Sequence, residues 1–279
     1  MKFAHALLTV FAVFAVAALI VLAWPQAYRV GGRYLLEKHD HADIMVAGPE
    51  TGTSKRVRVL FVGNSLTFTN DLPGMLANIA ASDPGNTVRL EIQAKTYPNA
   101  KLDYMLKHTD ALDWAHRHRP DVVVLQEHSD WYNGWNYEFG KSDVAAWAAA
   151  LRPLGITPVF FQIWGDGKGS PAFTDQQYST YGKTPADDAA ASAQASAAVG
   201  ESMKMPVVWV GRAFSMAGTI DGVPDLYKFD SHHPSAAGTY LAALVFYRYF
   251  TGRSGSEATY RPFGMSAASA AKLVELSGY

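Results

Sequence analysis

One stretch of the sequence decides the fold, and it reads Val59-Leu60-Phe61-Val62-Gly63-Asn64-Ser65-Leu66-Thr67. Its four leading apolar residues are typical of a buried strand, and Gly63 permits a tight turn where that strand ends. Because a helix is expected to follow the turn, Ser65 should lie at the carboxyl edge of a sheet. Open α/β sheets bind their ligands at that edge. The stretch therefore predicts an α/β fold with a serine placed where ligands bind.

Outward from this strand, β-branched runs alternate with helical stretches, which predicts a mainly parallel sheet covered by helices on both faces. The expected strands are 57–62, 87–94, 121–125, 157–164 and 206–210. The expected helices are 72–82, 102–117, 143–151, 187–203 and 235–250. Asn70 or Asp71 is the expected cap of the first helix, with Pro73 near its start. The fold class is thus an α/β three-layer sandwich, with the catalytic domain at 56–279.

The composition supports one large domain. The chain has 279 residues, of which 49% are hydrophobic and 18% are charged, and it can bury a sizeable core. Its formal net charge of -1 at pH 7 gives no basic field, so no nucleic-acid partner is expected. The sequence contains no cysteine, which excludes disulfides, thiolate nucleophiles and cysteine-linked lipids.

The amino terminus predicts a membrane segment. Residues 4–24 are almost all apolar, and at about 1.5 Å per residue a helix of this length matches a hydrocarbon layer of roughly 30 Å. The exit Trp24-Pro25-Gln26-Ala27 fits a cleavage site poorly, which favours an uncleaved anchor over a signal peptide. We therefore divide the start of the chain into an anchor or signal segment, 1–27, and a linker, 28–55. The linker run of His39, Asp40, His41 and Asp43 is given no metal-binding role.

A second motif stands immediately before the last predicted helix and reads Asp230-Ser231-His232-His233-Pro234-Ser235. A serine hydroxyl becomes a good nucleophile when an imidazole accepts its proton, and a carboxylate improves that imidazole by fixing its tautomer. The three-residue spacing allows Asp230 to reach Nδ1 of His233. We expect Ser65 as nucleophile, His233 as base and Asp230 as its orienting acid. The alternatives are His232 as base and Ser65 as a simple helix cap.

Together the two motifs resemble the SGNH/GDSL hydrolases. The first block of that family is Gly-Asp-Ser-Leu, and the last is Asp-x-x-His, often followed by proline. Here the blocks read Gly63-Asn64-Ser65-Leu66-Thr67 and Asp230-Ser231-His232-His233-Pro234, in the same order. With Leu-Gln-Glu-His-Ser at 125–129, the chain looks like an uncharacterised bacterial branch. The resemblance covers roughly 56–252 and implies the SGNH (flavodoxin-like) fold and serine-hydrolase activity.

The middle blocks depart from the family pattern, and this concerns the oxyanion hole. The family's second block offers a glycine N–H, but the corresponding stretch, Thr96-Tyr97-Pro98-Asn99-Ala100, has no glycine. The main-chain N–H of Asn99 or Ala100 is the expected donor, beside that of Ser65. The third block offers an asparagine, which 122–130 lacks, and the Gln126 amide is the best substitute. A structural role for Gln126 at the strand end is the alternative.

The expected substrate contacts follow the predicted strands, and they are Asn64, Glu127, His128, Trp131 and Trp164. Aromatic faces stack on sugar rings or cover acyl groups, and Tyr132, Trp135 and Tyr137 add to this set. The Gly-, Ser-, Thr- and Tyr-rich stretch 165–185 is expected to be a surface loop and is a candidate lid.

The sequence therefore predicts a serine esterase that needs no metal or organic cofactor. An O-acetyl ester of an envelope carbohydrate is the favoured substrate, because an anchored or exported enzyme of the bacterial periplasm or cell envelope meets such esters. A lipase or small-ester esterase is one alternative. A catalytically silent envelope-binding module on the same fold is another, and the irregular middle blocks keep it open.

Overall fold

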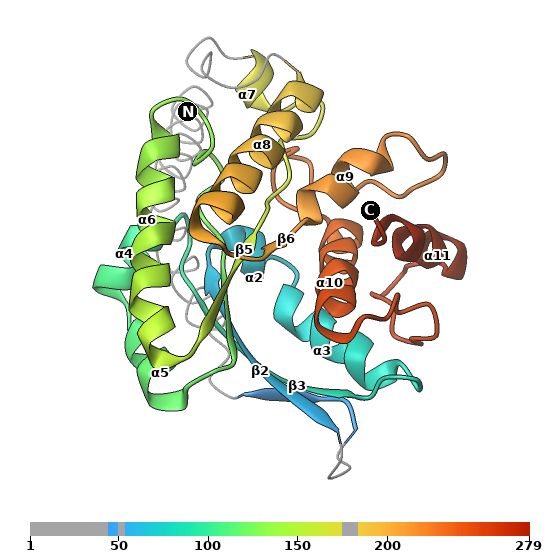
Figure 1. Cartoon of the computed structure of the whole chain (residues 1–279). Coiled ribbons are helices and arrows are strands. Elements are labelled where there is room, and N and C mark those ends of the chain that lie inside the picture. Colours follow the sequence, from blue (N-terminus) through green and yellow to red (C-terminus); the bar gives the residue numbers. More distant parts are fainter. Residues whose placement is uncertain (1–43, 50–53, 175–183) are drawn as a thin grey trace, which may run out of the picture. The chain divides into compact units, whose positions relative to one another are not determined.

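The computed structural model describes residues 44–49, 54–174 and 184–279, and within them it contains a six-stranded sheet (Figure 1). The strands are β1 (Met45–Ala47), β2 (Lys55–Gly63), β3 (Val88–Thr96), β4 (Val122–Leu125), β5 (Thr157–Phe161) and β6 (Val207–Val208). Their order across the sheet is β1-β3-β2-β4-β5-β6. All pairings are parallel except that of β1 with β3. The prediction of an α/β fold with a mainly parallel sheet is therefore confirmed.

The antiparallel edge strand β1 was not expected. Met45 pairs with Ile92 and Ala47 pairs with Leu90, so this short strand covers the edge of β3. Four residues of the segment expected to be a linker thus belong to the sheet, the three of β1 and Lys55 at the start of β2. The pairing satisfies main-chain groups that an open edge would leave exposed.

Helices lie on both faces of the sheet (Figure 1). Those after β2 are α2 (Ser65–Phe68) and α3 (Leu72–Ser82); α4 (Leu102–His108) and α5 (Ala111–His118) follow β3. Further along are α6 (Asn136–Leu151), η1 (Arg152–Leu154), α7 (Pro171–Thr174), α8 (Pro185–Met203), α9 (Val210–Ala217), α10 (Ala236–Thr251) and α11 (Ala267–Leu276). Helices α3 and α10 pack together, whereas α6 contacts α4 and α8. The two groups form the outer layers of the sandwich.

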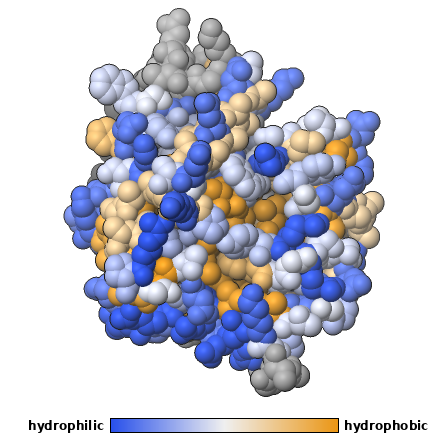
Figure 2. Space-filling view, viewed as in Figure 1, coloured by the Kyte–Doolittle hydropathy of each residue, from blue (hydrophilic) through white to orange (hydrophobic). Residues whose placement is uncertain are grey.

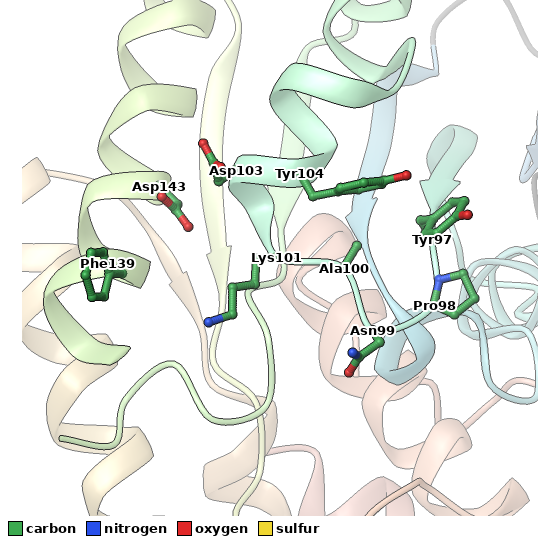
Figure 3. A pocket seen from close by; sticks show the side chains of 9 residues that line it. All are labelled: Tyr97, Pro98, Asn99, Ala100, Lys101, Asp103, Tyr104, Phe139 and Asp143. Carbon is green, nitrogen blue, oxygen red and sulfur yellow. The ribbon is translucent and has the colours of Figure 1, made fainter. Parts of the chain in front are cut away.

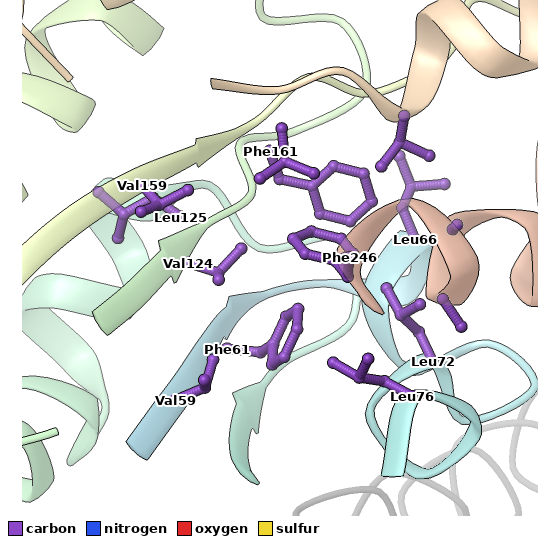
Figure 4. Close-up of a cluster of buried hydrophobic side chains, with 14 of the residues drawn as sticks. Val59, Phe61, Leu66, Leu72, Leu76, Val124, Leu125, Val159, Phe161 and Phe246 are labelled. Carbon is purple, nitrogen blue, oxygen red and sulfur yellow. The ribbon is translucent and has the colours of Figure 1, made fainter. Parts of the chain in front are cut away.

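The core explains why β4 and residues 59–63 of β2 are apolar throughout. In β2, Phe61 packs edge-to-face against Phe246 of α10, with ring centroids 5.1 Å apart, and Phe161 of β5 does the same at 5.0 Å (Figure 4). All three rings are fully buried. Parallel strands covered on both faces must be apolar on both faces. On the surface viewed in Figure 2, hydrophilic residues form most of the rim and apolar residues gather toward the middle.

The predicted helix 102–117 is two helices instead of one. Between α4 and α5, Thr109 Oγ1 accepts from the N–H of Ala111 at 3.3 Å and donates to the Met105 carbonyl at 2.6 Å. This side chain competes with the helical pattern of the main chain, as threonine commonly does at helix ends. The break gives the loop after β3 a short helix, α4, that begins close to the site.

The strand order creates a crevice at the carboxyl edge of the sheet. Strand β2 lies between β3 and β4, so the chain leaves β2 for one side of the sheet and later returns to the other side. Connections that depart in opposite directions leave a crevice above the central strands, and ligands bind there in this fold class. The loops after β2, β3 and β4 all border it. They carry Ser65, Asn99 and His128, respectively.

The predicted anchor or signal segment lies outside the described residues, as do the histidines and aspartates of the 39–43 run. In residues 44–49, 54–174 and 184–279, no helix is long and apolar enough to span a membrane.

Candidate active site

Three predicted catalytic residues are joined by hydrogen bonds. Ser65, at the start of α2, has its Oγ 2.9 Å from Nε2 of His233. On the other side of the ring, His233 Nδ1 lies 2.8 Å from Oδ2 of Asp230. The side chains of His233 and Asp230 are 31% and 33% exposed, so a substrate can reach them. This contact order is the one in which a histidine can take the serine proton while a carboxylate orients the ring.

The turn that holds the acid and the base is built by the acid itself. Asp230 Oδ1 accepts from the main-chain N–H groups of His232 and His233 at 3.0 and 2.9 Å. Burial favours the neutral acid, but these amides and the His233 ring hold the pKa of Asp230 below its ordinary value. The carboxylate thus remains charged and accepts the Nδ1–H of His233. Ser231 completes the tight turn with a left-handed φ of 54°.

The nucleophile is placed by buried side chains next to it. Asn64 is the N-cap of α2, and its Oδ1 accepts from the Leu66 amide at 3.1 Å while its Nδ2 donates to the Ala100 carbonyl at 3.0 Å. Asn64 is only 2% exposed. The expectation that Asn64 contacts substrate is therefore wrong: its side chain caps the helix that carries Ser65.

The carboxamide of Gln126 likewise bonds to neighbouring groups of the protein. Its Nε2 donates to Asn64 Oδ1 at 2.9 Å and to the Glu127 carbonyl at 2.5 Å. Its Oε1 accepts from the Asn64 amide and from Thr67 Oγ1, both at 2.9 Å. Both amide hydrogens are used, and the residue is 1% exposed. The prediction that Gln126 donates to the oxyanion is corrected to the structural alternative.

Gly63 is required by this network and not only by the turn. A Cβ at Gly63 would lie 2.5 Å from Gln126 Oε1 and 2.8 Å from Thr67 Oγ1. These separations are far below van der Waals contact, so any side chain would displace Gln126. Glycine allows the carboxamide to reach the residue before the nucleophile.

The loop after β3 carries both candidate main-chain donors, Asn99 and Ala100, between which the sequence leaves the choice open. Asn99 adopts a left-handed conformation, with φ 56°, in the stretch where the family has glycine. Asparagine is among the few non-glycine residues that adopt this conformation readily. The Ala100 N–H is already used, because it donates to the Tyr97 carbonyl at 3.2 Å, whereas the backbone–backbone hydrogen bonds of the described residues do not use the N–H of Asn99 or Ser65. Of the two predicted loop donors, Asn99 is thus the one that remains.

Glu127 and His128 join two loops of the site. Glu127 is 1% exposed, and its carboxylate accepts from the His128 amide at 2.6 Å and the Leu102 amide at 3.0 Å. Burial raises the pKa of Glu127 to about 8 despite these amides. This burial contradicts the predicted substrate contact for Glu127. The His128 ring, in contrast, lies near the surface and contacts Asn99 and Asp130.

The predicted tryptophan contacts are core residues. Trp131 is 1% exposed and packs against Phe160, with ring centroids 5.1 Å apart. Trp164 is 3% exposed, stacks on Phe214 at 4.3 Å and donates from Nε1 to the His232 carbonyl at 3.1 Å. Neither indole is open to substrate, so both predictions are wrong. Trp164 instead supports the loop that carries the base.

Three further aromatic residues were considered with them. Tyr132 is buried, and its hydroxyl donates to Asp188 at 2.9 Å. Tyr137 stacks on Trp131 with centroids 6.0 Å apart. Trp135 is 87% exposed at the start of α6.

His232 is turned away from the nucleophile. Its Nδ1 lies 2.6 Å from Oδ1 of Asp166, and the other oxygen of that carboxylate accepts from Ser170 Oγ at 2.6 Å. These contacts attach the base loop to the first part of the expected lid, 165–185. Residues 175–183 of the lid lie outside the described residues. Of the two histidines, only His233 contacts Ser65.

Asn70 forms a bridge near the site that the sequence does not predict. Asn70 was considered only as a helix cap, a role that Asp71 fulfils by accepting from the Gly74 amide at 3.0 Å. Asn70 Nδ2 donates instead to the Pro234 carbonyl and to Thr239 Oγ1, both at 2.9 Å. It thereby ties the segment after the nucleophile to the residue after the base. Asn70 has a left-handed φ of 55°, a conformation that asparagine tolerates.

One cavity lies against the Asn99 loop and another borders the catalytic turn. The first has a volume of about 540 Å³, and Figure 3 shows its lining, which is residues 97–101, Asp103 and Tyr104 together with Phe139 and Asp143 of α6. The other, of about 350 Å³, is lined by the base turn and by polar groups that include Ser129, Asp166 and Ser170. Both volumes lie in the range of small-molecule sites.

A serine, an imidazole and a carboxylate in contact at the carboxyl edge of a parallel sheet define a serine hydrolase. Among solved structures, the chain is similar to a protein from Slackia heliotrinireducens described as a candidate SGNH hydrolase, with 26% identity and a TM-score of 0.58 over 70% of this chain and 100% of that chain. It also shares the fold of a DUF4886 family protein from Bacteroides uniformis, with 14% identity and a TM-score of 0.62 over 80% and 93% of the two chains. No protein-family model and no curated protein matches the sequence. The chain belongs to the SGNH hydrolase superfamily, as its blocks predicted.

Proposed function

We propose that the protein is a serine esterase that works by acyl transfer. His233 Nε2 takes the proton of Ser65 as Oγ attacks the ester carbonyl. The main-chain N–H groups of Ser65 and Asn99 stabilise the oxyanion, and the protonated ring then delivers its proton to the leaving alcohol. Water, deprotonated by the same histidine, releases the acid from the acyl-enzyme. Asp230 orients the ring in both halves of the reaction.

The observation that carries this proposal is the unbroken series of contacts from Ser65 through His233 to Asp230, at 2.9 and 2.8 Å. A silent binding module has no need to keep all three groups at hydrogen-bonding distance. It has even less need to keep the carboxylate charged by aiming two main-chain amides at it. The geometry therefore favours an enzyme over a silent module.

The experiment is labelling with a fluorophosphonate, followed by hydrolysis of p-nitrophenyl acetate. The wild-type protein should be labelled, and Ser65→Ala should lose both labelling and hydrolysis while keeping its melting temperature. Ser254→Ala is a matched control, because Ser254 lines neither cavity and its hydroxyl donates to Ser256. A wild-type protein that is folded but neither labelled nor active would support the silent module.

For the substrate, we propose an O-acetylated carbohydrate of the cell envelope. The cavity beside Asn99 has the chemistry that sugars require, because Tyr97, Tyr104 and Phe139 are 46%, 38% and 65% exposed, respectively, and offer open aromatic faces. Carboxylates of Asp103 and Asp143 stand on the same wall and can accept from hydroxyl groups (Figure 3). A lipid chain would gain little from two carboxylates in its binding site, since it has no hydrogen-bond donor to offer them.

The sugar proposal is tested by comparing two acetyl esters. Tyr97→Ala and Tyr104→Ala should raise KM about tenfold for an acetylated oligosaccharide and leave the hydrolysis of p-nitrophenyl acetate unchanged. Phe263→Ala provides the control, because Phe263 is a fully exposed aromatic residue that lines neither cavity. Equal effects on both esters would argue for a small-ester esterase.

A further inference from the structure

A second imidazole–carboxylate pair stands beside the catalytic one. His128 Nδ1 lies 2.6 Å from Oδ1 of Asp130, and His128 Nε2 lies 2.7 Å from Oδ1 of Asn99. The carboxylate contact resembles that of the catalytic base, but the roles at Nε2 differ, because an amide oxygen only accepts and His128 Nε2 must donate to it, whereas His233 Nε2 accepts from the serine hydroxyl. An amide oxygen has no proton to lose, so this histidine cannot activate a nucleophile. Its role must come from what it holds.

His128 holds the loop that carries the main-chain N–H of Asn99. Asn99 is exposed and left-handed, a conformation that costs a non-glycine residue more than glycine. Main-chain hydrogen bonds fix the residues on either side: the Tyr97 amide donates to Gly63 and the Ala100 amide donates to Tyr97. The Asn99 side chain is therefore the contact by which the outer part of this loop is tied to the rest of the site.

The pair is itself braced. The second oxygen of Asp130 accepts from Asn136 Nδ2 at 3.0 Å, at the start of α6. The main-chain N–H of His128 donates to buried Glu127 at 2.6 Å. The His128 and Asp130 side chains are only 17% and 22% exposed. Asp130 is thus held by α6 and the His128 main chain by Glu127, while the ring contacts Asp130 through Nδ1 and Asn99 through Nε2.

We propose that His128 and Asp130 form a clamp that acts through the Asn99 side chain and keeps the Asn99 main-chain N–H aimed at the oxyanion. This inference rests on the proposed esterase function. The clamp compensates for a departure from the family pattern, which has in this block a glycine, a residue that adopts left-handed conformations without strain. Here asparagine adopts such a conformation, and its side chain gives the loop an anchor that glycine lacks. His128 and Asp130 are positioning residues, since neither touches the reacting atoms.

A double-mutant cycle tests the clamp. The four proteins are the wild type, His128→Ala, Asn99→Gly and the double variant, and kcat is expressed per site titrated with fluorophosphonate. We expect His128→Ala to lower kcat about tenfold with little change in KM for p-nitrophenyl acetate. Asn99→Gly keeps the left-handed backbone and loses the anchor, so it should lower kcat similarly. The double variant should lose no more than either single variant, because both remove the same contact.

His128→Gln and melting temperatures complete the test. The Gln amide can donate to Asn99 Oδ1, so His128→Gln should recover part of the lost kcat. A histidine with a purely structural role would lower the melting temperature and the number of titratable sites but not kcat per site. Losses that multiply in the double variant, or an unchanged kcat in His128→Ala, would overturn the clamp. If the wild type is neither labelled nor active, the esterase proposal fails and the clamp fails with it.

Discussion

Gln126 and Asn64 hold each other in place. Gln126 Nε2 donates to Asn64 Oδ1, and the Asn64 main-chain N–H donates back to Gln126 Oε1, both across 2.9 Å. The pair connects the end of β4 to the residue before the nucleophile. A side chain that completes two bonds to one neighbour, in a site closed to solvent, determines where that neighbour stands.

Gln126→Ala should therefore act on stability. The change leaves the Asn64 amide and the Thr67 hydroxyl without their buried acceptor, and each unsatisfied group costs about 1–3 kcal/mol. We expect a clear fall in melting temperature with nearly normal kcat in the molecules that stay folded. Measuring both on the same preparation decides the matter. A fall in kcat of about 10²–10³ with an unchanged melting temperature would return Gln126 to the oxyanion hole.

Substitutions of the two adjacent histidines should have different effects on activity. His233→Ala removes the general base and should lower kcat by roughly 10²–10⁴. His232→Ala loses the contact to Asp166 and the edge-to-face packing on the His233 ring but leaves the His233 hydrogen bonds to Ser65 and Asp230, so it should keep most of the activity. Both variants should be assayed with p-nitrophenyl acetate, with circular dichroism as the check on folding. Equal losses would mean that the base has been misassigned.

Glu127 predicts a pH dependence of stability. Its pKa of about 8 in the folded protein exceeds the ordinary 4.5, so the unfolded chain gives up this proton first as the pH rises. Stability should fall between pH 4.5 and about 8 and level off above that range. Glu127→Gln removes this proton, and its melting temperature should fall less over the same interval, by a difference on the order of 5 °C. Thermal melts of both proteins at pH 5, 6, 7 and 8 provide the measurement. Parallel curves would contradict the assignment.

The apolar amino-terminal stretch predicts where the protein is found in the cell. The apolar stretch 4–24 should hold the full-length chain in the membrane fraction, and a chain that begins at residue 44 should move to the soluble fraction and keep its activity. Starting at residue 44 retains β1 and the covered edge of β3. Fractionation and N-terminal sequencing test both points. A mature protein that begins just after Ala27 would show cleavage instead.

The contacts among Ser65, His233 and Asp230 could be predicted because their signals are local. An apolar strand that ends in Gly-x-Ser places Ser65, and a three-residue spacing places Asp230 against His233. Gln126 could not be assigned, because a carboxamide at a strand end can point to substrate or to the scaffold. The choice is made by Asn64, which lies 62 positions away in the sequence. Trp131 and Trp164 follow strands as binding residues do, but their burial depends on packing against distant rings.

Backbone conformation explains the remaining misses. Asn99 and Asn70 have the left-handed conformation that asparagine tolerates, yet the sequence does not say which asparagines use it. Strand β1 has three residues and exists because β3 offers it an edge. The break between α4 and α5 depends on how one threonine satisfies the main chain. In each case a partner chosen by the tertiary fold overrides the local pattern.

The acid and the base of this site belong to the same turn. Asp230 and His233 lie three residues apart on one turn, whereas the contact from His233 to Ser65 spans 168 positions of the chain. The catalytic series therefore has a single long-range joint. A displacement of the turn by about 1 Å would uncouple the nucleophile and leave the acid–base pair intact, with a large loss of rate. Small movements of this one turn can therefore switch the activity off and on again while Asp230 and His233 stay in contact.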